Sequence, residues 1–307
     1  MKLLTMLIMT TLMVFTVFAE DTTKMTEEQY LKRLQETKEA FEKTLPKFAG
    51  NLEAYYMIFD YMGKGYVKLE TDIIVQIKDF ASTKSSEWTM TFNAKDDANF
   101  SVKQTWKIKR SDFYTNDEGF GIYIKRFSLE KGVYRNISLS LNGDNNETLS
   151  ASIPEFRTLQ LSDLKAKVGQ MFLINSMNEV RDNMFMRRKA TIIPNLSAYY
   201  NKIKTFGFFF EYYHLKSDAL TSEGSYQVKY KIINEIFNTP IHEATEVLKD
   251  QHKNGAIKVP PIDLSSVHFG GVYRLEVEFT DLSSGEKFEK SMYFYIEKPL
   301  TKENENK

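Results

Sequence analysis

From about residue 50 onward, apolar and polar residues alternate along the chain with a period of two. Successive side chains of a β-strand point to opposite faces, so this alternation predicts antiparallel sheets with one buried face and one exposed face. Runs rich in Gly, Asn, Asp and Ser separate the alternating stretches, as expected of tight turns. Many short strands without helices between them are typical of β-sandwiches. The clearest alternating stretches span residues 67–73, 88–92, 137–141, 226–232, 273–279 and 292–296.

The sequence Gly-Val-Tyr-Arg occurs twice, at residues 132–135 and again at 271–274, which is 139 residues later. Each copy leads into an alternating stretch and then into a polar turn, so the spacing indicates duplicated domains. Tyr273 is in phase with the apolar residues that follow it, whereas Tyr134 is one residue out of phase with Ile137. A β-bulge after Tyr134 would restore the phase.

We therefore predict a mainly β fold, with two tandem Ig-like antiparallel β-sandwiches preceded by one amphipathic helix. The expected divisions are a signal peptide over residues 1–19, the helical segment over 20–49, sandwiches over 50–190 and 191–298, and a polar tail over 299–307.

Residues 26–45 have the pattern of an amphipathic helix. Thr26 and Gln29 form a capping-box pair, and Pro46 ends the helix. One apolar stripe runs along it, made by Tyr30, Leu34, Phe41 and Leu45, with Leu31 at its margin. This narrow stripe favours docking on the first sandwich, and the alternative is contact with a partner or a second copy.

The first 19 residues have the pattern of an export signal. Lys2 gives a positive start, an uncharged and mostly apolar run follows, and Ala19 precedes the expected cleavage site. A retained membrane anchor is the alternative, but the apolar run is short for a span of about 20 residues. We expect an exported protein, in the periplasm or outside the cell, with no stable membrane insertion after cleavage.

The charge balance limits the classes of partner. The chain has 41 Lys and Arg, 41 Asp and Glu and no cysteine. A neutral chain has no basic surface for nucleic acid, so no nucleic-acid partner is expected. Without cysteine there are no disulfides and no thiolate nucleophiles or thiolate-bound metals.

No catalytic, metal-binding or cofactor motif emerges from the sequence. Gly63-Lys64-Gly65 lacks the Ser or Thr that ends a phosphate-binding loop, so it is interpreted as a turn. The four histidines, His214, His242, His252 and His268, do not have the spacing of a zinc site. We therefore expect no cofactor and no enzymatic activity.

Two acidic segments have competing interpretations. Residues 142–147 place Asp144 and Glu147 among asparagines, which suits either calcium or a hairpin turn, and the turn is favoured because the ligand order of an EF-hand is missing. Glu211 lies in an aromatic run, where a carboxyl would have a raised pKa. It has no evident carboxylate partner, so an outward-facing position at a strand edge is favoured over a catalytic role.

The run from Phe206 to Leu215 is unusually aromatic for a strand. If one face packs in the core, aromatic side chains remain on the other face and need to be covered. We predict an interaction surface that includes Phe209, Tyr212 and Tyr213. The first sandwich is expected to cover most of it, and a partner, either a protein or a glycan, the remainder.

Several short motifs resemble the region that precedes the named domain in bacterial GWxTD-domain proteins. They are Pro-Asn-Leu-Ser at 194–197, the aromatic run at 208–215, Gly-Val-Tyr-Arg-Leu at 271–275 and Asp-Leu-Ser-Ser-Gly at 281–285. The likeness spans about residues 50–298. No Gly-Trp-x-Thr-Asp motif occurs, so the resemblance implies export and tandem sandwiches but no activity.

These features favour an exported, non-enzymatic binding or assembly protein of the cell envelope that acts through its sandwich surfaces. A carbohydrate-binding module is the alternative, and it predicts a flat row of exposed aromatic side chains on one sheet face. A hydrolase is the third candidate, and it requires polar side chains that converge in a pocket.

Overall fold

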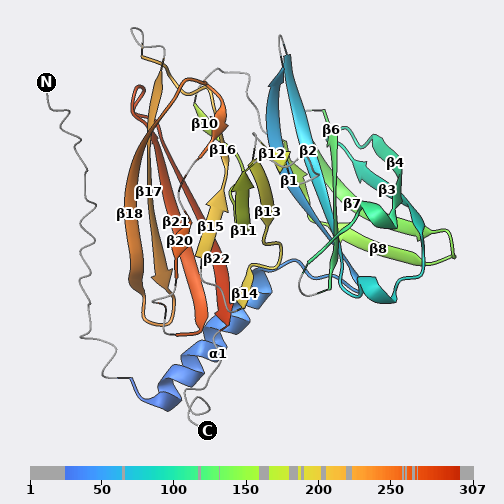
Figure 1. Ribbon diagram of the computed structural model, residues 1–307, viewed down its shortest axis with the longest axis horizontal. Coiled ribbons are helices and arrows are strands. Elements are labelled where there is room, and N and C mark those ends of the chain that lie inside the picture. Colours follow the sequence, from blue (N-terminus) through green and yellow to red (C-terminus); the bar gives the residue numbers. More distant parts are fainter. Residues whose placement is uncertain are drawn as a thin grey trace, which may run out of the picture.

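The computed structural model contains two β-sandwiches side by side, with one helix, α1 (Glu27–Thr44), against the lower end of the left-hand sandwich in Figure 1. The mainly β fold predicted from the alternation is confirmed. The structure describes residues 25–63, 66–116, 119–130, 132–158, 166–179, 186–187, 190–201, 205–218, 223–257, 259, 261–264, 267 and 269–297. The predicted signal peptide and polar tail lie outside these residues.

The first sandwich consists of two antiparallel sheets around one core. Its strands are β1 (Leu52–Gly63), β2 (Tyr66–Ile77), β3 (Glu87–Lys95), β4 (Ser101–Lys109), β5 (Tyr114–Thr115), β6 (Gly121–Ser128), β7 (Val133–Gly143), β8 (Thr148–Ile153) and β9 (Phe156–Arg157), with short 3-10 helices at Phe80–Ser82 and Arg110–Asp112. One sheet has the order β1-β2-β6-β5 and the other β4-β3-β7-β8, with β9 beside β7. Side chains such as Ile73, Trp88 and Leu139 fill the space between them.

The second sandwich is larger. Its strands are β10 (Lys167–Val168), β11 (Phe172–Glu179), β12 (Met186–Arg187), β13 (Ala190–Pro194), β14 (Tyr199–Asn201), β15 (Thr205–Phe209), β16 (Glu211–Tyr213), β17 (Gly224–Asn234), β18 (Thr239–Asp250), β19 (Gly255–Ala256), β20 (Ile262–Asp263), β21 (Gly271–Asp281) and β22 (Lys287–Glu297). A sheet of order β14-β22-β21-β17-β18 faces the sheet β12-β13-β11-β15-β20 and the short sheet β10-β16-β19. Their shared core is rich in aromatic rings, including Phe206, Tyr226 and Phe294.

Four strands of each sandwich match in order and register. The sheet order β4-β3-β7-β8 corresponds to β18-β17-β21-β22. Trp88 of β3 lies opposite Gly143 of β7, and Tyr226 of β17 lies opposite Asp281 of β21. Both members of the second pair come 138 residues after their counterparts, so the central strands of the two sandwiches pair in one common register. This match supports the duplication inferred from the repeated tetrapeptide.

The repeated Tyr has the same hydrogen bond in both sandwiches. The Tyr134 hydroxyl donates to the carbonyl oxygen of Glu130 at 2.9 Å, and the Tyr273 hydroxyl donates to that of Phe269 at 2.6 Å. In each case the acceptor lies four residues before the Tyr. This is the tyrosine corner of Ig-like sandwiches, in which the ring is buried and its hydroxyl fixes the approach to the strand.

The predicted bulge after Tyr134 is confirmed. Asn93 lies opposite Ser138, but Lys95 lies opposite Arg135, so β7 has one residue more than β3 over this stretch. Asn136 within that stretch has φ of +51°, a left-handed conformation that Asn adopts more readily than most residues. As a result both Tyr134 and Ile137 point into the core. The extra residue also explains why the repeat spacing is 139 before the bulge and 138 after it.

The helix forms as predicted but docks elsewhere. The Thr26 hydroxyl accepts from the Gln29 backbone N–H at 3.2 Å, and the Gln29 side chain accepts from the Thr26 N–H at 3.0 Å, so the capping box is present. The expectation that the helix docks on the first sandwich is wrong. Phe41 is buried in the core of the second sandwich, where its ring faces Tyr199 and Tyr295, because that core is open at the end of β22.

The second sandwich begins before residue 190, where the sequence placed the boundary. β11 is hydrogen-bonded to β13 and β15, and β10 is bonded to β16. The chain therefore leaves the first sandwich after β9, and residues from about 166 onward belong to the second. α1 is neither long nor apolar enough to cross a membrane, and it is the only α-helix in the described part of the chain.

Candidate functional site

The two sandwiches meet through an apolar interface. The sheet β1-β2-β6 is buried on both faces, because Ile73 and Val75 point into the first core while Ile74 points toward the second sandwich. The interface joins residues of both sandwiches, namely Met57, Ile74, Ile122 and Ile124 of the first and Phe172, Ile174, Ile192 and Phe209 of the second. The three consecutive apolar residues at 73–75 break the period of two. This break was a sequence signal of double-sided burial, which the prediction of one exposed face overlooked.

Phe209 lies where the sequence predicted that most of the aromatic surface would be covered. It is buried in the interface between the sandwiches, and its ring lies 5.2 Å from that of Phe172. The first sandwich therefore covers this residue, and no part of it is left for a partner.

Tyr212 and Tyr213 do not form an interaction surface, because both are fully buried within the second sandwich. The Tyr212 ring packs against Tyr226 and Phe279, and its hydroxyl donates to the Asp250 carboxylate at 2.6 Å. The predicted exposure was wrong because sheets lie on both sides of β16, which burial of one strand face alone did not reveal.

The expected outward position of Glu211 is also wrong. Glu211 is buried, and its carboxylate accepts a hydrogen bond of 2.6 Å from the Tyr213 hydroxyl. A buried carboxylate held by a neighbouring hydroxyl satisfies the fold, since an unpaired buried charge would be costly.

A second buried carboxylate lies beside the interface, at Glu53 of β1. It accepts hydrogen bonds from the Tyr55 hydroxyl at 2.8 Å and from the Gln76 amide at 3.1 Å, and it pairs with Lys78 at 2.6 Å. Burial raises the pKa of Tyr55, and the nearby Glu53 charge and hydrogen bond raise that pKa further. Because every polar partner here is supplied by β1 and the end of β2, this network holds the edge of the first sandwich in shape next to the second.

An apolar groove of about 400 Å³ opens at the junction of α1, the first sandwich and the second sandwich. We call it the junction groove. The end of α1 supplies Phe41 and Leu45, β1 supplies residues 54–57, and the second sandwich supplies residues 171–173, 194–196 and 292–293. These elements are far apart in the sequence, and the groove exists only because α1 crosses to the second sandwich.

Local hydrogen bonds shape one wall of the junction groove at the Pro-Asn-Leu-Ser motif. The Asn195 N–H donates to the Leu173 carbonyl oxygen at 2.9 Å, and the Asn195 side chain donates to the Tyr199 carbonyl oxygen at 2.8 Å. The Ser197 hydroxyl donates to the Asn195 side-chain oxygen at 3.2 Å. These bonds fix a tight turn that presents Pro194 and Leu196 to the groove.

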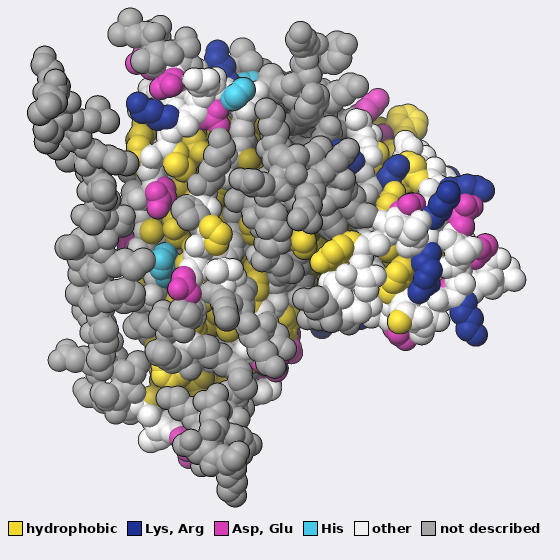
Figure 2. All heavy atoms as spheres, viewed as in Figure 1, with side chains coloured by type: hydrophobic (Ala, Val, Ile, Leu, Met, Phe, Trp, Pro, Cys, Tyr) yellow, Lys and Arg dark blue, Asp and Glu magenta, His cyan; other side chains and the backbone are white. Residues whose placement is uncertain are grey.

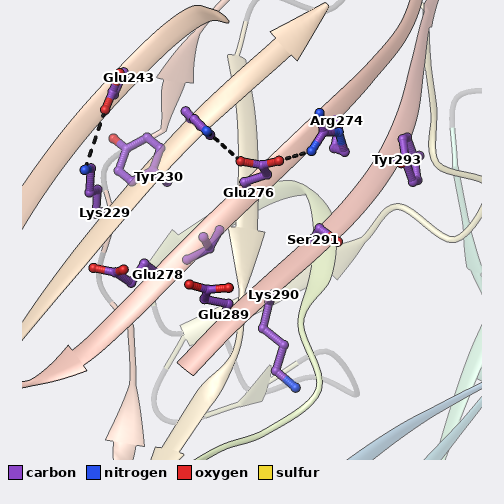
Figure 3. Close-up of a pocket in the computed structure, with 12 residues that line it drawn as sticks. Lys229, Tyr230, Glu243, Arg274, Glu276, Glu278, Glu289, Lys290, Ser291 and Tyr293 are labelled. Carbon is purple, nitrogen blue, oxygen red and sulfur yellow. Dashed lines mark hydrogen bonds and ion pairs between the residues drawn. The ribbon is translucent and has the colours of Figure 1, made fainter. Parts of the chain in front are cut away.

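A second hollow, of about 450 Å³, lies on the outer face of the sheet β18-β17-β21-β22 and is lined by charged side chains (Figure 3). Opposite charges are paired across it, since Lys231 lies 2.8 Å from Glu276 and Lys229 lies 4.0 Å from Glu243. Arg274 bonds to Glu276 and also to Glu235. The lining charges neutralise one another, so this hollow has no net field to select an anion or a cation.

The segment 142–147 forms the hairpin turn between β7 and β8. The Gly143 N–H donates to the Glu147 carbonyl oxygen at 2.7 Å, and Asn146 has φ of +67°. The acidic side chains bind protein groups: Asp144 accepts from the Ser86 N–H at 3.1 Å, and Glu147 accepts from the Ser85 hydroxyl at 3.2 Å. The turn interpretation therefore holds. Across the described residues there is no group of three or more side chains able to hold a metal ion.

The described histidines are separated in the structure. The His214 N–H donates to the Asn254 side chain at 2.9 Å, His242 stacks on Tyr230, and His252 pairs with Asp250 at 2.9 Å. His268 and the central residues of Gly63-Lys64-Gly65 lie outside the described residues.

No family model and no curated protein match the chain. Among solved structures, it is similar to dimeric latent PorU from Porphyromonas gingivalis at 12% identity and a TM-score of 0.30, covering 84% of this chain and 21% of that one. It is also similar to Escherichia coli alpha-2-macroglobulin activated by porcine elastase, at 10% identity and a TM-score of 0.21, covering 80% and 24%. CBD12 from CALX1.2 has 8% identity and a TM-score of 0.18, with 70% and 76% covered. This chain thus spans about a fifth of the PorU chain.

Proposed function

We propose that this protein is an exported binding or assembly protein of the cell envelope, which acts without catalysis by holding an apolar segment of a partner protein in the junction groove. The groove itself carries this proposal, because it combines an apolar lining with walls from both sandwiches and from α1. Ligand sites are commonly concave, mostly apolar and located between domains, with volumes of roughly 300–1,000 Å³.

The rim of the junction groove suits a protein partner. Tyr293 lies on β22 at this rim and is 42% exposed. Tyrosine is enriched at protein interfaces because it combines a large apolar surface with a polar tip. Beside it, the apolar side chains of Leu196 and Met292 can accept the side chains of an extended segment.

A carbohydrate-binding role is supported less well. The large exposed aromatic residues of the described chain are Phe100, Tyr114, Phe269 and Tyr293. They lie after β3, on β5, before β21 and on β22, so they do not line up along one sheet face. Sugar rings bind most strongly to aromatic side chains that present a shared flat surface, and this arrangement does not offer one.

Site-specific photo-crosslinking tests the proposal. A crosslinking amino acid at Tyr293 is expected to give a discrete protein adduct in the native host, and Leu196→Asp should abolish it by placing a charge in the groove. The same amino acid at Tyr114 is the matched control, since Tyr114 is 38% exposed but lies away from the groove. Equal adducts from both positions, or none from Tyr293, would contradict the proposal.

Export is tested separately by cell fractionation and N-terminal sequencing. The mature protein should begin near Glu20 and appear in the periplasmic or extracellular fraction. Intact Met1 in a membrane fraction would show that the leader is retained.

A further inference from the structure

β18 forms one edge of the five-stranded sheet in the second sandwich, and no described strand pairs with its outer side. Its counterpart in the first sandwich, β4, is also an edge. The two edges differ in their exposed residues. β4 exposes Lys103, Lys107 and Lys109, whereas β18 exposes Ile241 at 37% and Val247 at 59%.

Lysine on an edge strand opposes pairing with another strand, because its charge would have to be desolvated or brought close to like charges. Figure 2 shows Lys and Arg side chains (dark blue) gathered over the first sandwich on the visible face. The first sandwich therefore carries a protection against edge pairing that the middle of β18 lacks, although both strands derive from the same position of the duplicated fold.

We propose that β18 pairs in antiparallel orientation with β18 of a second copy of this chain, so that the outer sheets of two molecules form one continuous sheet. Such a contact is two-fold symmetric, and its register is defined by the residue that lies opposite itself. The residues around that centre decide which registers are favourable.

A two-fold axis at Ala244 gives complementary pairs throughout. Ile241 then lies opposite Val247 of the second copy, so the two exposed apolar side chains of each edge cover one another. His242 lies opposite Glu246, and directly opposite residues are close enough for such side chains to interact. Because the contact is symmetric, each of these pairs occurs twice.

The neighbouring registers are less favourable. An axis at Glu243 or at Glu246 places two identical carboxylates opposite each other, which is destabilising. An axis at Thr245 places Val247 opposite Glu243 and leaves both apolar side chains against charged residues. The sequence of β18 therefore favours a single register.

His242 gives independent support. Its ring stacks on Tyr230 with centroids 5.7 Å apart, and among the described residues its Nε2 atom is buried without a hydrogen-bond partner. An unsatisfied buried polar atom is unfavourable. In the register centred on Ala244, Glu246 of the second copy brings a carboxylate to this imidazole and can accept a hydrogen bond from it.

The β-bulge at the start of β18 defines the length of the contact. Ile232 of β17 lies opposite His242, but Ile233 lies opposite Pro240, so Ile241 is the extra residue. Regular pairing therefore extends from His242 to Glu246, and Ile241 and Val247 close it at both ends. Pro240, which has no backbone N–H, prevents the pairing from continuing further.

Single cysteine variants of the full chain test both the contact and its register, because the natural chain has no cysteine. Ala244→Cys should form a disulfide-linked dimer under mild oxidation, since its two copies lie opposite one another across the axis. Glu243→Cys and Thr245→Cys should remain largely unlinked. Efficient linkage at Glu243→Cys or Thr245→Cys, or none at Ala244→Cys, would overturn the register.

Sedimentation of the cysteine-free chain tests the association itself. We expect a dimer that Val247→Lys weakens by roughly tenfold or more, because the substitution removes two cross-strand apolar contacts and places a charge at the edge. Thr105→Lys at the matching edge strand β4 is the control and should leave the dimer unchanged. A natural chain that sediments as a monomer, or a dimer that survives Val247→Lys, would overturn the proposal.

Discussion

The Phe41 ring of α1 packs edge-on against the Tyr199 ring of β14, with their centroids 5.4 Å apart. This pair joins the segment that precedes the first sandwich to a strand that follows it. The first sandwich is therefore enclosed between two parts of the second, and the chain passes between them twice, once after α1 and once after β9. Two chain crossings and a shared apolar interface oppose free hinging of the sandwiches.

Removing the Phe41 ring should destabilise the second sandwich. We expect Phe41→Ala to lower the free energy of unfolding by about 3 kcal/mol, because a buried aromatic side chain is lost and a cavity remains. Urea denaturation of the full chain measures this change. Leu31→Ala is the control on the same helix, and since Leu31 is exposed its effect should stay within about 0.5 kcal/mol.

The two tyrosine corners should contribute similar stability. Tyr134→Phe and Tyr273→Phe each remove a hydroxyl that donates to a carbonyl oxygen, so each should cost about 1 kcal/mol. The two costs should add in the double variant, because the residues lie in different sandwiches. Denaturation of single and double variants checks this, with Tyr293→Phe on the exposed rim as the control. A silent substitution at either corner would show that the hydrogen bond has no structural role.

The Asp72–Arg126 pair should stabilise the first sandwich. The Asp72 carboxylate is buried and accepts two hydrogen bonds from the Arg126 guanidinium, both at 2.8 Å. We expect Asp72→Ala to cost about 2 kcal/mol, since hydrogen bonds to charged groups are stronger than neutral ones. Arg126→Lys should also destabilise, because an ammonium group cannot make both bonds in the same geometry. A double-mutant cycle measured by urea denaturation gives the coupling between the two side chains.

Phe209→Ser and Tyr212→Ser should have different consequences. Phe209 lies in the interface between the sandwiches, so its substitution should cost about 3 kcal/mol and also loosen the junction, seen as a larger radius of gyration in small-angle scattering. Tyr212 lies in the core of the second sandwich, so its substitution should lower stability without separating the sandwiches. Identical scattering for both variants and the natural chain would contradict the role given to Phe209.

Alkaline pH should destabilise the second sandwich. Burial raises the pKa of Tyr226 from 10.0 to about 12, and the nearby Asp250 charge adds to this shift. Burial and the Glu246 charge raise the pKa of Tyr230 to about 12. The folded state therefore favours the neutral phenols, and this stabilisation is complete below the unfolded-state pKa and is lost as the pH rises through the folded-state pKa.

Stability should accordingly decline between pH 10 and about 12. The double variant Tyr226→Phe, Tyr230→Phe should show a smaller decline over this range. Urea denaturation at several pH values, with tyrosinate absorbance recorded in parallel, checks both statements. An equal decline in the natural and double-variant chains would assign the alkaline sensitivity to other groups.

Much of the fold could be predicted from local sequence patterns because they reflect local physical rules. The alternation in β3 requires strand geometry with one buried face, and the structure shows it residue by residue. The capping box at Thr26 depends only on neighbouring residues. The bulge at Asn136 followed from a one-residue phase conflict between Tyr134 and Ile137, because side-chain direction reverses with every residue.

The junction groove and the burial of Tyr212 were decided only by tertiary structure. The stripe that contains Phe41 showed that α1 needs an apolar surface, but both sandwiches could offer one, and nothing local selects between them. Likewise an aromatic strand shows how much apolar surface must be covered, but the number of sheets that cover it depends on contacts between residues far apart in the chain. Hydrophobic burial is non-directional, so sequence periodicity determines which face of an element is buried and leaves its partner to the packing of the whole molecule.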